Sequence, residues 1–267
     1  MTRLAGRLAG LRGRGRKALS TFITAGDPDA TATVPAMHAL VAGGADIIEL
    51  GVPFSDPEAD GPAVQAGSER ALANGTTLHD VLGMVAAFRA ADADTPVVLM
   101  GYLNVFLKMG YENFCGAAGE AGIDGVIVVN LPPEEAGDFK AALCSHDLDL
   151  VLLVAPTTTS ERFRYIAGEA SGFLYYVSYK GITGAEHLDA RAVGERLQAM
   201  RPGLGDLPVL VGFGIKDGAS AAAVARHADG VVVGSVLVNT MGNVGGSEIP
   251  ARLTAQVRDI RTALDTL

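Results

Sequence analysis

The chain has little of what would tie it to a metal, a membrane or an oxidising compartment. It has no tryptophan and only two cysteines, Cys115 and Cys144, which form no metal or redox motif and are typical of a reducing compartment. The five histidines show no ligand spacing among themselves, so we expect no metal. The apolar run Val231–Val238 is too short to span a membrane and contains Gly234 and Ser235. We therefore expect a soluble, cytoplasmic protein.

Charge is also scarce, and it is unevenly distributed. Charged residues make up 19% of the 267 residues, and the formal net charge is −9. Residues 1–17 hold six bases and no acid, so residues 18–267 carry 15 bases against 30 acids, a net charge of −15. An acidic body of this kind argues against nucleic acid as the main partner. Residues 1–17, the basic head, lack the long apolar segment of a targeting peptide, because glycine and arginine residues interrupt their apolar residues.

Apolar residues, by contrast, make up 49% of the chain and fall into short runs at fairly even spacing. Runs that are continuously rich in valine, isoleucine and leucine predict parallel strands that are buried on both faces. Eight such runs occur: Ala18–Thr24, Asp46–Leu50, Pro96–Met100, Gly125–Val129, Leu150–Val154, Gly172–Val177, Pro208–Gly212 and Gly230–Val233.

Between these runs lie alanine-rich stretches with helix start signals. The signals are Asp27-Pro28, Thr77 with Asp80, Pro132–Glu135, Ser160-Glu161 and Asp217. Eight strand–helix units without a linker predict an α/β fold, a (β/α)8 TIM barrel, as a single domain over residues 1–267. The alternative is a doubly wound open sheet, although no Gly-x-Gly-x-x-Gly follows the first run.

In such a barrel the chemistry lies where the strands end, which makes two carboxyl groups candidates. Glu49 stands inside an apolar run, where burial moves a carboxyl pKa towards the range that a general acid or base needs. A structural glutamate paired with a lysine or arginine is the alternative. Three prolines restrict the next loop, residues 51–62, and we expect it to hold Asp60 towards a partly cationic or N–H-bearing substrate. Alternatively, Asp56 and Asp60 are turn and N-cap residues.

Glycines at the last two strand ends predict an anion site. Gly212–Ile215 and Gly234-Ser235 follow the seventh and eighth runs, where backbone N–H groups and a helix start bind phosphate in barrels of this kind. Close packing is the alternative reason for these glycines. The sixth run contains Tyr175, either near the site or as a filler of the barrel. The polar stretch Gly181–Gly184 after it is suited to a lid that closes on a ligand.

The most specific pattern in the chain begins at the first of these carboxyl groups. It reads Glu49-Leu50-Gly51-Val52-Pro53-Phe54-Ser55-Asp56-Pro57, followed by Ala59-Asp60-Gly61-Pro62. Further stretches of the same kind extend over most of the chain: Thr24–Pro28, Tyr102 with Asn104, Leu131–Glu135, Ala155–Thr158, Gly181–Gly184, Gly212–Ile215 and Gly234-Ser235. Together they resemble the tryptophan synthase α subunit family.

The resemblance implies a retro-aldol lyase that splits indole-3-glycerol phosphate into indole and glyceraldehyde 3-phosphate without a cofactor or metal. Glu49 is then expected to protonate indole C3 and take up the glycerol hydroxyl proton, and Asp60 to stabilise positive charge at the indole N–H. Tyr175 is the third implied catalytic residue, beside Glu49. The implied phosphate residues are Gly184, Phe213, Gly214, Gly234 and Ser235. The implied indole pocket consists of Phe22, Met100, Tyr102, Ile127, Val129, Leu153 and Thr183.

The resemblance also implies an extra N-terminal helix below the barrel and a β subunit as partner, in an α2β2 complex. The implied partner-facing loops contain Asp56, Glu58, Asn130, Tyr179 and Lys180. At Glu58, at Asn130 and at Tyr179-Lys180 they depart from the residues usual in the family. A stand-alone lyase that releases free indole for a specialised pathway therefore stays open beside the β-dependent subunit.

Three other classes of protein fit the sequence less well. A non-catalytic regulatory subunit that binds the phosphorylated ligand has no need of Glu49 or Asp60. A phosphosugar isomerase of similar build has no use for an apolar pocket. A Schiff-base aldolase would have to use Lys180, a lysine of the expected lid.

Overall fold

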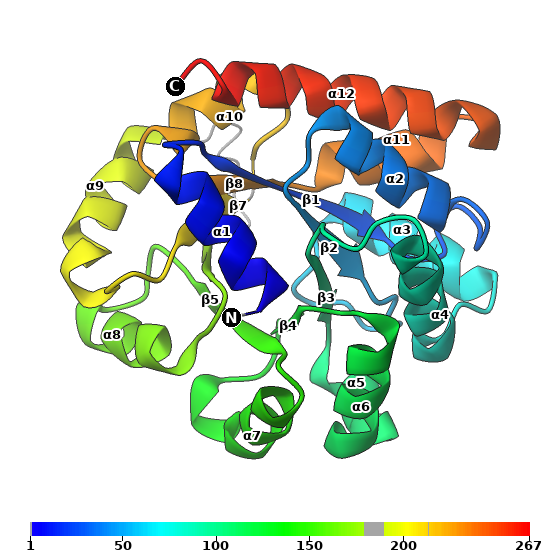
Figure 1. The fold of residues 1–267 in the computed structure, drawn as a ribbon, viewed down its shortest axis with the longest axis horizontal. Coiled ribbons are helices and arrows are strands. Elements are labelled where there is room, and N and C mark those ends of the chain that lie inside the picture. Colours follow the sequence, from blue (N-terminus) through cyan, green and yellow to red (C-terminus); the bar gives the residue numbers. More distant parts are fainter. Residues whose placement is uncertain (1, 179–189, 213) are drawn as a thin grey trace.

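Eight parallel strands close into a barrel that is surrounded by helices (Figure 1). The structure is a computed structural model, and it describes residues 2–178, 190–212 and 214–267. The strands follow one another in chain order: β1 (Ala18–Thr24), β2 (Ile47–Gly51), β3 (Val97–Gly101), β4 (Gly125–Val128), β5 (Asp149–Val154), β6 (Leu174–Val177), β7 (Val209–Gly212) and β8 (Gly230–Val233). The barrel closes where β8 pairs with β1, with Gly230 aligned to Ala18.

The closed sheet confirms the predicted barrel and excludes the open doubly wound sheet. All eight apolar runs are strands, and their ends differ from the expected ones by at most two residues. Side chains that face inward, such as Ile47, Val98 and Ile127, form one apolar cluster inside the barrel. Those that face outward, such as Ile48 and Val126, form a second cluster with the helices. Burial on both faces explains why the runs are continuous rather than alternating.

Helix α1 precedes the first strand, and the other helices follow the strands in turn and cover the outside of the barrel (Figure 1). They are α1 (Arg3–Gly13), α2 (Thr33–Gly43), α3 (Pro62–Ala73), α4 (Leu78–Arg89), α5 (Leu103–Met109), α6 (Tyr111–Ala121), α7 (Gly137–Ser145), α8 (Ser160–Glu169), α9 (Ala190–Met200), α10 (Gly218–Ala225), α11 (Ser235–Asn243) and α12 (Ile249–Leu264). Three 3-10 turns join them: η1 (Pro133–Glu135), η2 (Arg201–Gly203) and η3 (Gly246–Glu248). Within the described residues, none of these helices has both the length and the apolar character needed to cross a bilayer.

Most of the expected helix start signals are confirmed, and one is wrong. Thr77 and Asp80 form a capping box in which each side chain accepts from the other residue's backbone N–H. The expected helix start at Pro132 is instead the turn η1, and α7 begins only at Gly137. Pro132 is extended, with ψ of 143°, because the ring of Pro133 disfavours helical geometry at the preceding residue.

The basic head forms helix α1, which lies across the N-terminal end of the barrel (Figure 1). Leu4, Leu8 and Leu11 share one face of this helix and are buried in the interior cluster. Its polar face is tied to the acidic body, because Arg3 forms an ion pair with Asp124. The helix therefore closes the end of the barrel that is opposite to the strand ends where chemistry is expected.

Candidate active site

Glu49 is a fully buried carboxyl group in the middle of β2. Its aligned neighbours are Phe22 on β1 and Val98 on β3. Its Oε1 accepts a hydrogen bond of 2.8 Å from the Ser20 hydroxyl, and its Oε2 has no partner among the described residues. Burial raises the pKa of Glu49 to about 8, and the hydrogen bond from Ser20 opposes that rise. Among the described residues no arginine or lysine pairs with it, so this part of the chain offers no structural ion pair to Glu49.

Asp60 is held by the loop that follows β2. Tyr102, directly after β3, donates its hydroxyl to the Asp60 carboxylate and accepts a 2.9 Å hydrogen bond from the N–H of Ala59. The Tyr102 ring also stacks on Phe54, with ring centroids 4.9 Å apart. Burial raises the pKa of Asp60 to about 6, and the hydrogen bond from Tyr102 opposes that rise. The N-cap of α3 is Gly61, so Asp60 does not cap that helix.

Tyr175 brings a phenol into the barrel from β6, where it is aligned with Leu153 on β5. It is buried, and burial together with the charges of Glu49 and Asp60 raises the pKa of the phenol well above its usual value. The phenol therefore stays protonated and is available as a hydrogen-bond donor. A Cβ at Gly212 on β7 would lie 2.1 Å from the phenol oxygen, so glycine is the residue that leaves room for this ring.

The described residues of the expected indole pocket lie around the C-terminal ends of four strands, β1, β3, β4 and β5. Phe22, Met100, Ile127 and Leu153 are on β1, β3, β4 and β5, whereas Tyr102 and Val129 directly follow β3 and β4. Met100, Val129 and Leu153 pack against the interior cluster and are partly exposed, whereas Ile127 is fully buried. A cavity of about 430 Å³ opens beside β4, β5 and β6, and Val129 and Leu153 line it. Its lining also includes Thr158 and Arg162, and neither Glu49 nor Asp60 borders it, so the cavity overlaps the expected indole pocket only at Val129 and Leu153.

Three of the expected phosphate residues lie at the ends of two paired strands, β7 and β8. Gly214 follows β7 with a φ of +76°, a left-handed conformation that favours glycine. Gly234 follows β8 and precedes Ser235, the first residue of α11. Unpaired N–H groups and the positive end of the dipole make such a helix start suitable for an anion. The other expected residues of the site and lid, Gly184, Phe213, Thr183, Tyr179 and Lys180, lie outside the described residues.

The remaining partner-facing residues, Asp56, Glu58 and Asn130, are all exposed. Asn130 Oδ1 accepts a 2.8 Å hydrogen bond from the N–H of Leu103, and its Nδ2 donates to Asn104 Oδ1 over 3.4 Å. These bonds fasten the loop after β4 to the start of α5. The exposed loops therefore surround the same end of the barrel as Glu49 and Asp60.

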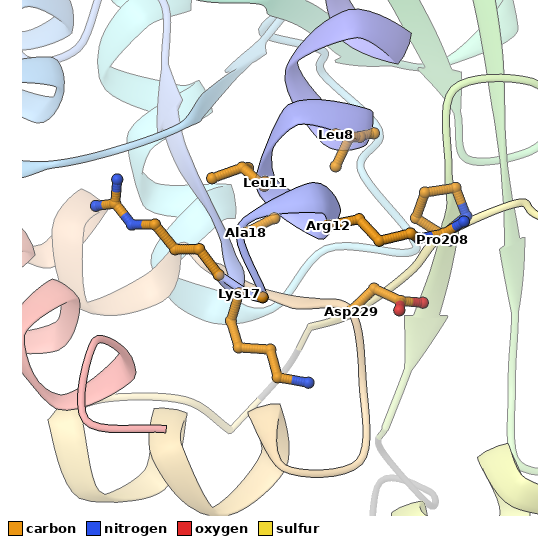
Figure 2. A pocket seen from close by; sticks show the side chains of 9 residues that line it. Leu8, Leu11, Arg12, Lys17, Ala18, Pro208 and Asp229 are labelled. Atoms are coloured by element: carbon orange, nitrogen blue, oxygen red, sulfur yellow. The ribbon is translucent and has the colours of Figure 1, made fainter.

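A second cavity, of about 120 Å³, lies at the opposite end of the barrel beneath α1 (Figure 2). Arg12, Lys17 and Asp229 line it, and the two basic side chains donate to the carbonyl oxygens of Asp206 and Ala228. The bond from Arg12 fastens α1 to the segment before β7, and the bond from Lys17 joins the residue before β1 to the segment before β8. In the described parts of the chain, no group of three or more His, Cys, Asp or Glu residues is placed to hold a metal ion.

Two residues that shape the site were not among those singled out from the sequence. Ser20 contacts Glu49, although a serine in an apolar run carries no signal of its own until the strand register is known. Phe54 stacks on Tyr102, and the sequence only shows it as one residue of a proline-rich loop. Tyr102 was expected as a pocket wall, and the structure adds that it also fixes the loop that carries Asp60.

Comparison with known proteins finds relatives that match nearly the whole chain. The family model "Tryptophan synthase alpha chain" matches residues 8–264. The chain is 55% identical over 265 residues to the tryptophan synthase alpha chain of Laribacter hongkongensis, which covers 99% of this chain and 100% of that protein. It also superposes on the crystal structure of tryptophan synthase subunit alpha from Legionella pneumophila with a TM-score of 0.92, at 42% identity and 100% coverage of both chains. A structure of tryptophan synthase from M. tuberculosis, in an aminoacrylate-bound form, gives a TM-score of 0.87 at 36% identity, covering 99% of this chain and 100% of that one. The chain therefore belongs to the tryptophan synthase alpha chain family, the lyases that cleave indole-3-glycerol phosphate.

Proposed function

We propose that this chain cleaves indole-3-glycerol phosphate with Glu49 as the proton carrier and Asp60 as the stabilising charge. The observation that carries the proposal is the burial of two carboxyl groups at one end of the barrel, which raises their pKa values to about 8 for Glu49 and about 6 for Asp60. At pH 7 Glu49 is therefore protonated and Asp60 ionised. Two carboxyl groups whose surroundings separate their pKa values in this way are suited to different roles in one reaction.

The roles follow from the protonation states. Protonated Glu49 gives its proton to indole C3, which places positive charge on the indole nitrogen, and ionised Asp60 stabilises that charge. The Glu49 carboxylate then takes the proton from the hydroxyl on the carbon bonded to C3. As that oxygen becomes a carbonyl, the carbon–carbon bond breaks and its electrons return to the ring. Indole and glyceraldehyde 3-phosphate leave, and Glu49 is protonated again.

The rest of the site binds the two ends of the substrate in this proposal. The apolar residues Phe22, Met100, Tyr102, Ile127, Val129 and Leu153, with Thr183 of the lid, surround the indole ring. Backbone N–H groups at Gly184, Gly214 and Ser235, beside Phe213 and Gly234, bind the phosphate, and the first turn of α11 supports them with its dipole. Tyr175 donates its phenol near Glu49, where it stays protonated. No cofactor or metal takes part in this scheme.

We further propose that the chain works in the cytoplasm, as one domain over residues 1–267, with a tryptophan synthase β subunit in an α2β2 complex. The exposed Asp56, Glu58 and Asn130 around the mouth of the barrel support a partner at that end, with Tyr179 and Lys180 contributing from the lid. The alternative is a stand-alone lyase that releases free indole.

Turnover by Glu49→Gln tests the proposed chemistry. Glutamine keeps the shape of the side chain but carries no transferable proton, so we expect turnover of indole-3-glycerol phosphate to fall by about 10²- to 10⁴-fold. Binding of the substrate should persist, measured by calorimetry. Indole release by the wild type should be greatest between about pH 6 and pH 8, where Asp60 is ionised and Glu49 protonated. A near-normal rate in Glu49→Gln would remove Glu49 from the reaction.

The same assay, run with and without an added β subunit, separates the two catalytic alternatives. Indole release that rises strongly when the β subunit is added supports the β-dependent α subunit. High turnover of the chain by itself supports the stand-alone lyase. Binding of the substrate with no indole under either condition would leave the regulatory alternative.

A further inference from the structure

The described part of the barrel interior contains a contact between a hydroxyl and the Glu49 carboxyl group that the chemistry above does not use. Ser20 on β1 is fully buried and is aligned with Ile47 on one side and Val232 on the other. A hydroxyl in such an apolar layer is unfavourable unless it forms a hydrogen bond. Its partner is Oε1 of Glu49, at 2.8 Å.

We propose that Ser20 is a positioning residue that fixes Oε1 of Glu49 and leaves Oε2 as the oxygen that exchanges protons with the substrate. The inference rests on the proposed function of Glu49 and assigns the reaction to one of its two oxygens. Oε1 accepts from Ser20 in the ionised form of the carboxyl group and can go on accepting when the group is neutral. The proton of neutral Glu49 therefore resides on Oε2, which has no partner among the described residues.

Ser20 is the group that opposes the effect of burial on Glu49. The neighbouring strands present Phe22 and Val98 to it, neither of which titrates. Tyr175 lies within electrostatic range of both Glu49 and Asp60. Its phenol stays neutral, and the negative charge of Asp60 cannot stabilise a second carboxylate. Within the described residues, the Ser20 hydroxyl is thus the one donor that favours ionised Glu49.

Ser20→Ala tests this assignment. A hydrogen bond to a charged group stabilises it enough to shift a pKa by about one unit or more, so the pKa of Glu49 should rise from about 8 by about one unit. The alkaline limb of the pH–rate profile should move upward by the same amount. We expect kcat to fall about tenfold, because the carboxylate formed after C3 protonation loses its donor. KM should stay unchanged, because Ser20 does not touch the substrate.

Two further variants separate positioning from packing. Ser20→Thr keeps the hydroxyl and should restore both the alkaline limb and kcat. Thr21→Val removes a hydroxyl from the next residue of the same strand, which is equally buried but bonds the carbonyl of Ile47 at 3.3 Å. It should alter thermal stability at most and leave the pH profile in place.

A direct titration of Glu49 distinguishes the two possible failures. The carboxyl carbon is followed by 13C NMR in protein labelled at glutamate, and its signal is the one lost in Glu49→Gln. An unchanged Glu49 titration in a folded Ser20→Ala variant would overturn the inference while leaving the proposed function intact. Full activity of Glu49→Gln would instead overturn the proposed function, whatever Ser20 does to the titration.

Discussion

At the N-terminal end of the barrel Asp46 and Asp124 are buried beside arginines, whereas Glu49 and Asp60 at the C-terminal end are held by hydroxyl groups. Burial raises the pKa of all four carboxyl groups. At the N-terminal end guanidinium charges and backbone N–H groups oppose the rise. At the C-terminal end a single neutral donor opposes it in each case.

The N-terminal carboxyl groups join elements that are distant in sequence. Asp124 pairs with Arg3 of α1 and with Arg89 at the end of α4, and it accepts a 2.8 Å hydrogen bond from the N–H of Val97. Asp46 likewise accepts from Arg261 of α12 at 3.1 Å. A buried carboxylate with these partners is satisfied and has little tendency to exchange protons.

The difference teaches that burial by itself does not make a carboxyl group reactive. Reactivity near neutral pH requires burial without a compensating cation, which leaves the charged form unfavourable and the proton exchangeable. The paired carboxylates at the N-terminal end, the closed end that α1 covers, stabilise the barrel. The two carboxyl groups at the C-terminal end, the open end, lower the stability of the fold. Substitutions at the two ends should therefore have opposite consequences.

The largest expected effect is on catalysis at the open end. Asp60→Asn removes the negative charge that stabilises the indole nitrogen, so turnover should fall by about 10²- to 10⁴-fold. The acidic limb of the pH–rate profile, near pH 6 in the wild type, should disappear because its titrating group is gone. Initial rates of indole release between pH 5 and pH 9 measure both effects.

The matched control for Asp60→Asn is Glu69→Gln, an exposed acid on the adjoining helix α3. It should leave the rate and both limbs unchanged. Retention of the acidic limb in Asp60→Asn would assign that limb to another group and weaken the contrast between the two ends.

The second effect is on the free energy of unfolding of Glu49→Gln. Most substitutions destabilise a protein, whereas this one should stabilise it. The folded-state pKa of Glu49 is about 8 against an ordinary value of 4.5, so the wild type loses stability as the pH rises between those values. Glu49→Gln has no charge to bury and should become relatively more stable over this window. From pH 5 to pH 9 its advantage in the free energy of unfolding should grow by about 4 kcal/mol, at about 1.4 kcal/mol for each pKa unit.

Urea unfolding of both proteins at each pH gives this difference directly, because every other group titrates in both. The informative result is the direction in which the stability difference between Glu49→Gln and the wild type changes as the pH rises. A constant difference across the pH range would mean that Glu49 is ionised throughout in the folded protein, as a paired carboxylate is.

The fold and the reactive carboxyl groups could be predicted from the sequence for physical reasons. Strands buried on both faces must be continuously apolar, so the barrel appears as eight runs. A carboxyl group inside such a run has to be paired or functional, which singles out Glu49. The wrong helix start at Pro132 arose because a proline favours a first turn but also constrains the residue before it.

What the sequence could not reveal depends on register and loop shape. Ser20 and Glu49 are 29 positions apart, and only the stagger between β1 and β2 brings the hydroxyl to the carboxyl oxygen. The Tyr102 hydroxyl meets Asp60 only because the loop after β2 folds back over the end of β3. The cations that satisfy Asp46 and Asp124 come from α12, α1 and α4, and sequence order does not indicate that these helices converge there.

The smallest expected effect is at the closed end, and it completes the comparison. Asp124→Asn keeps the size of the side chain but leaves Arg89 without its charged partner in a largely buried position. Removing one member of a buried pair usually lowers the free energy of unfolding by 3–5 kcal/mol. We expect about 3 kcal/mol, because Arg89 keeps hydrogen bonds to the carbonyl oxygens of Gly122, Asp92 and Thr95.

The control for this variant is Asp94→Asn, an exposed acid close to the same end of the barrel, which should change stability by less than about 0.5 kcal/mol. In contrast to Asp60→Asn, the Asp124→Asn protein should keep its kcat and both limbs of the pH profile when assayed well below its melting temperature. A loss of kcat per folded molecule would mean that the two ends are coupled through the strands. The expected result is that Asp124→Asn keeps its kcat and loses stability, whereas Glu49→Gln gains stability. This result would establish that the barrel separates the carboxyl groups that stabilise it from those that react.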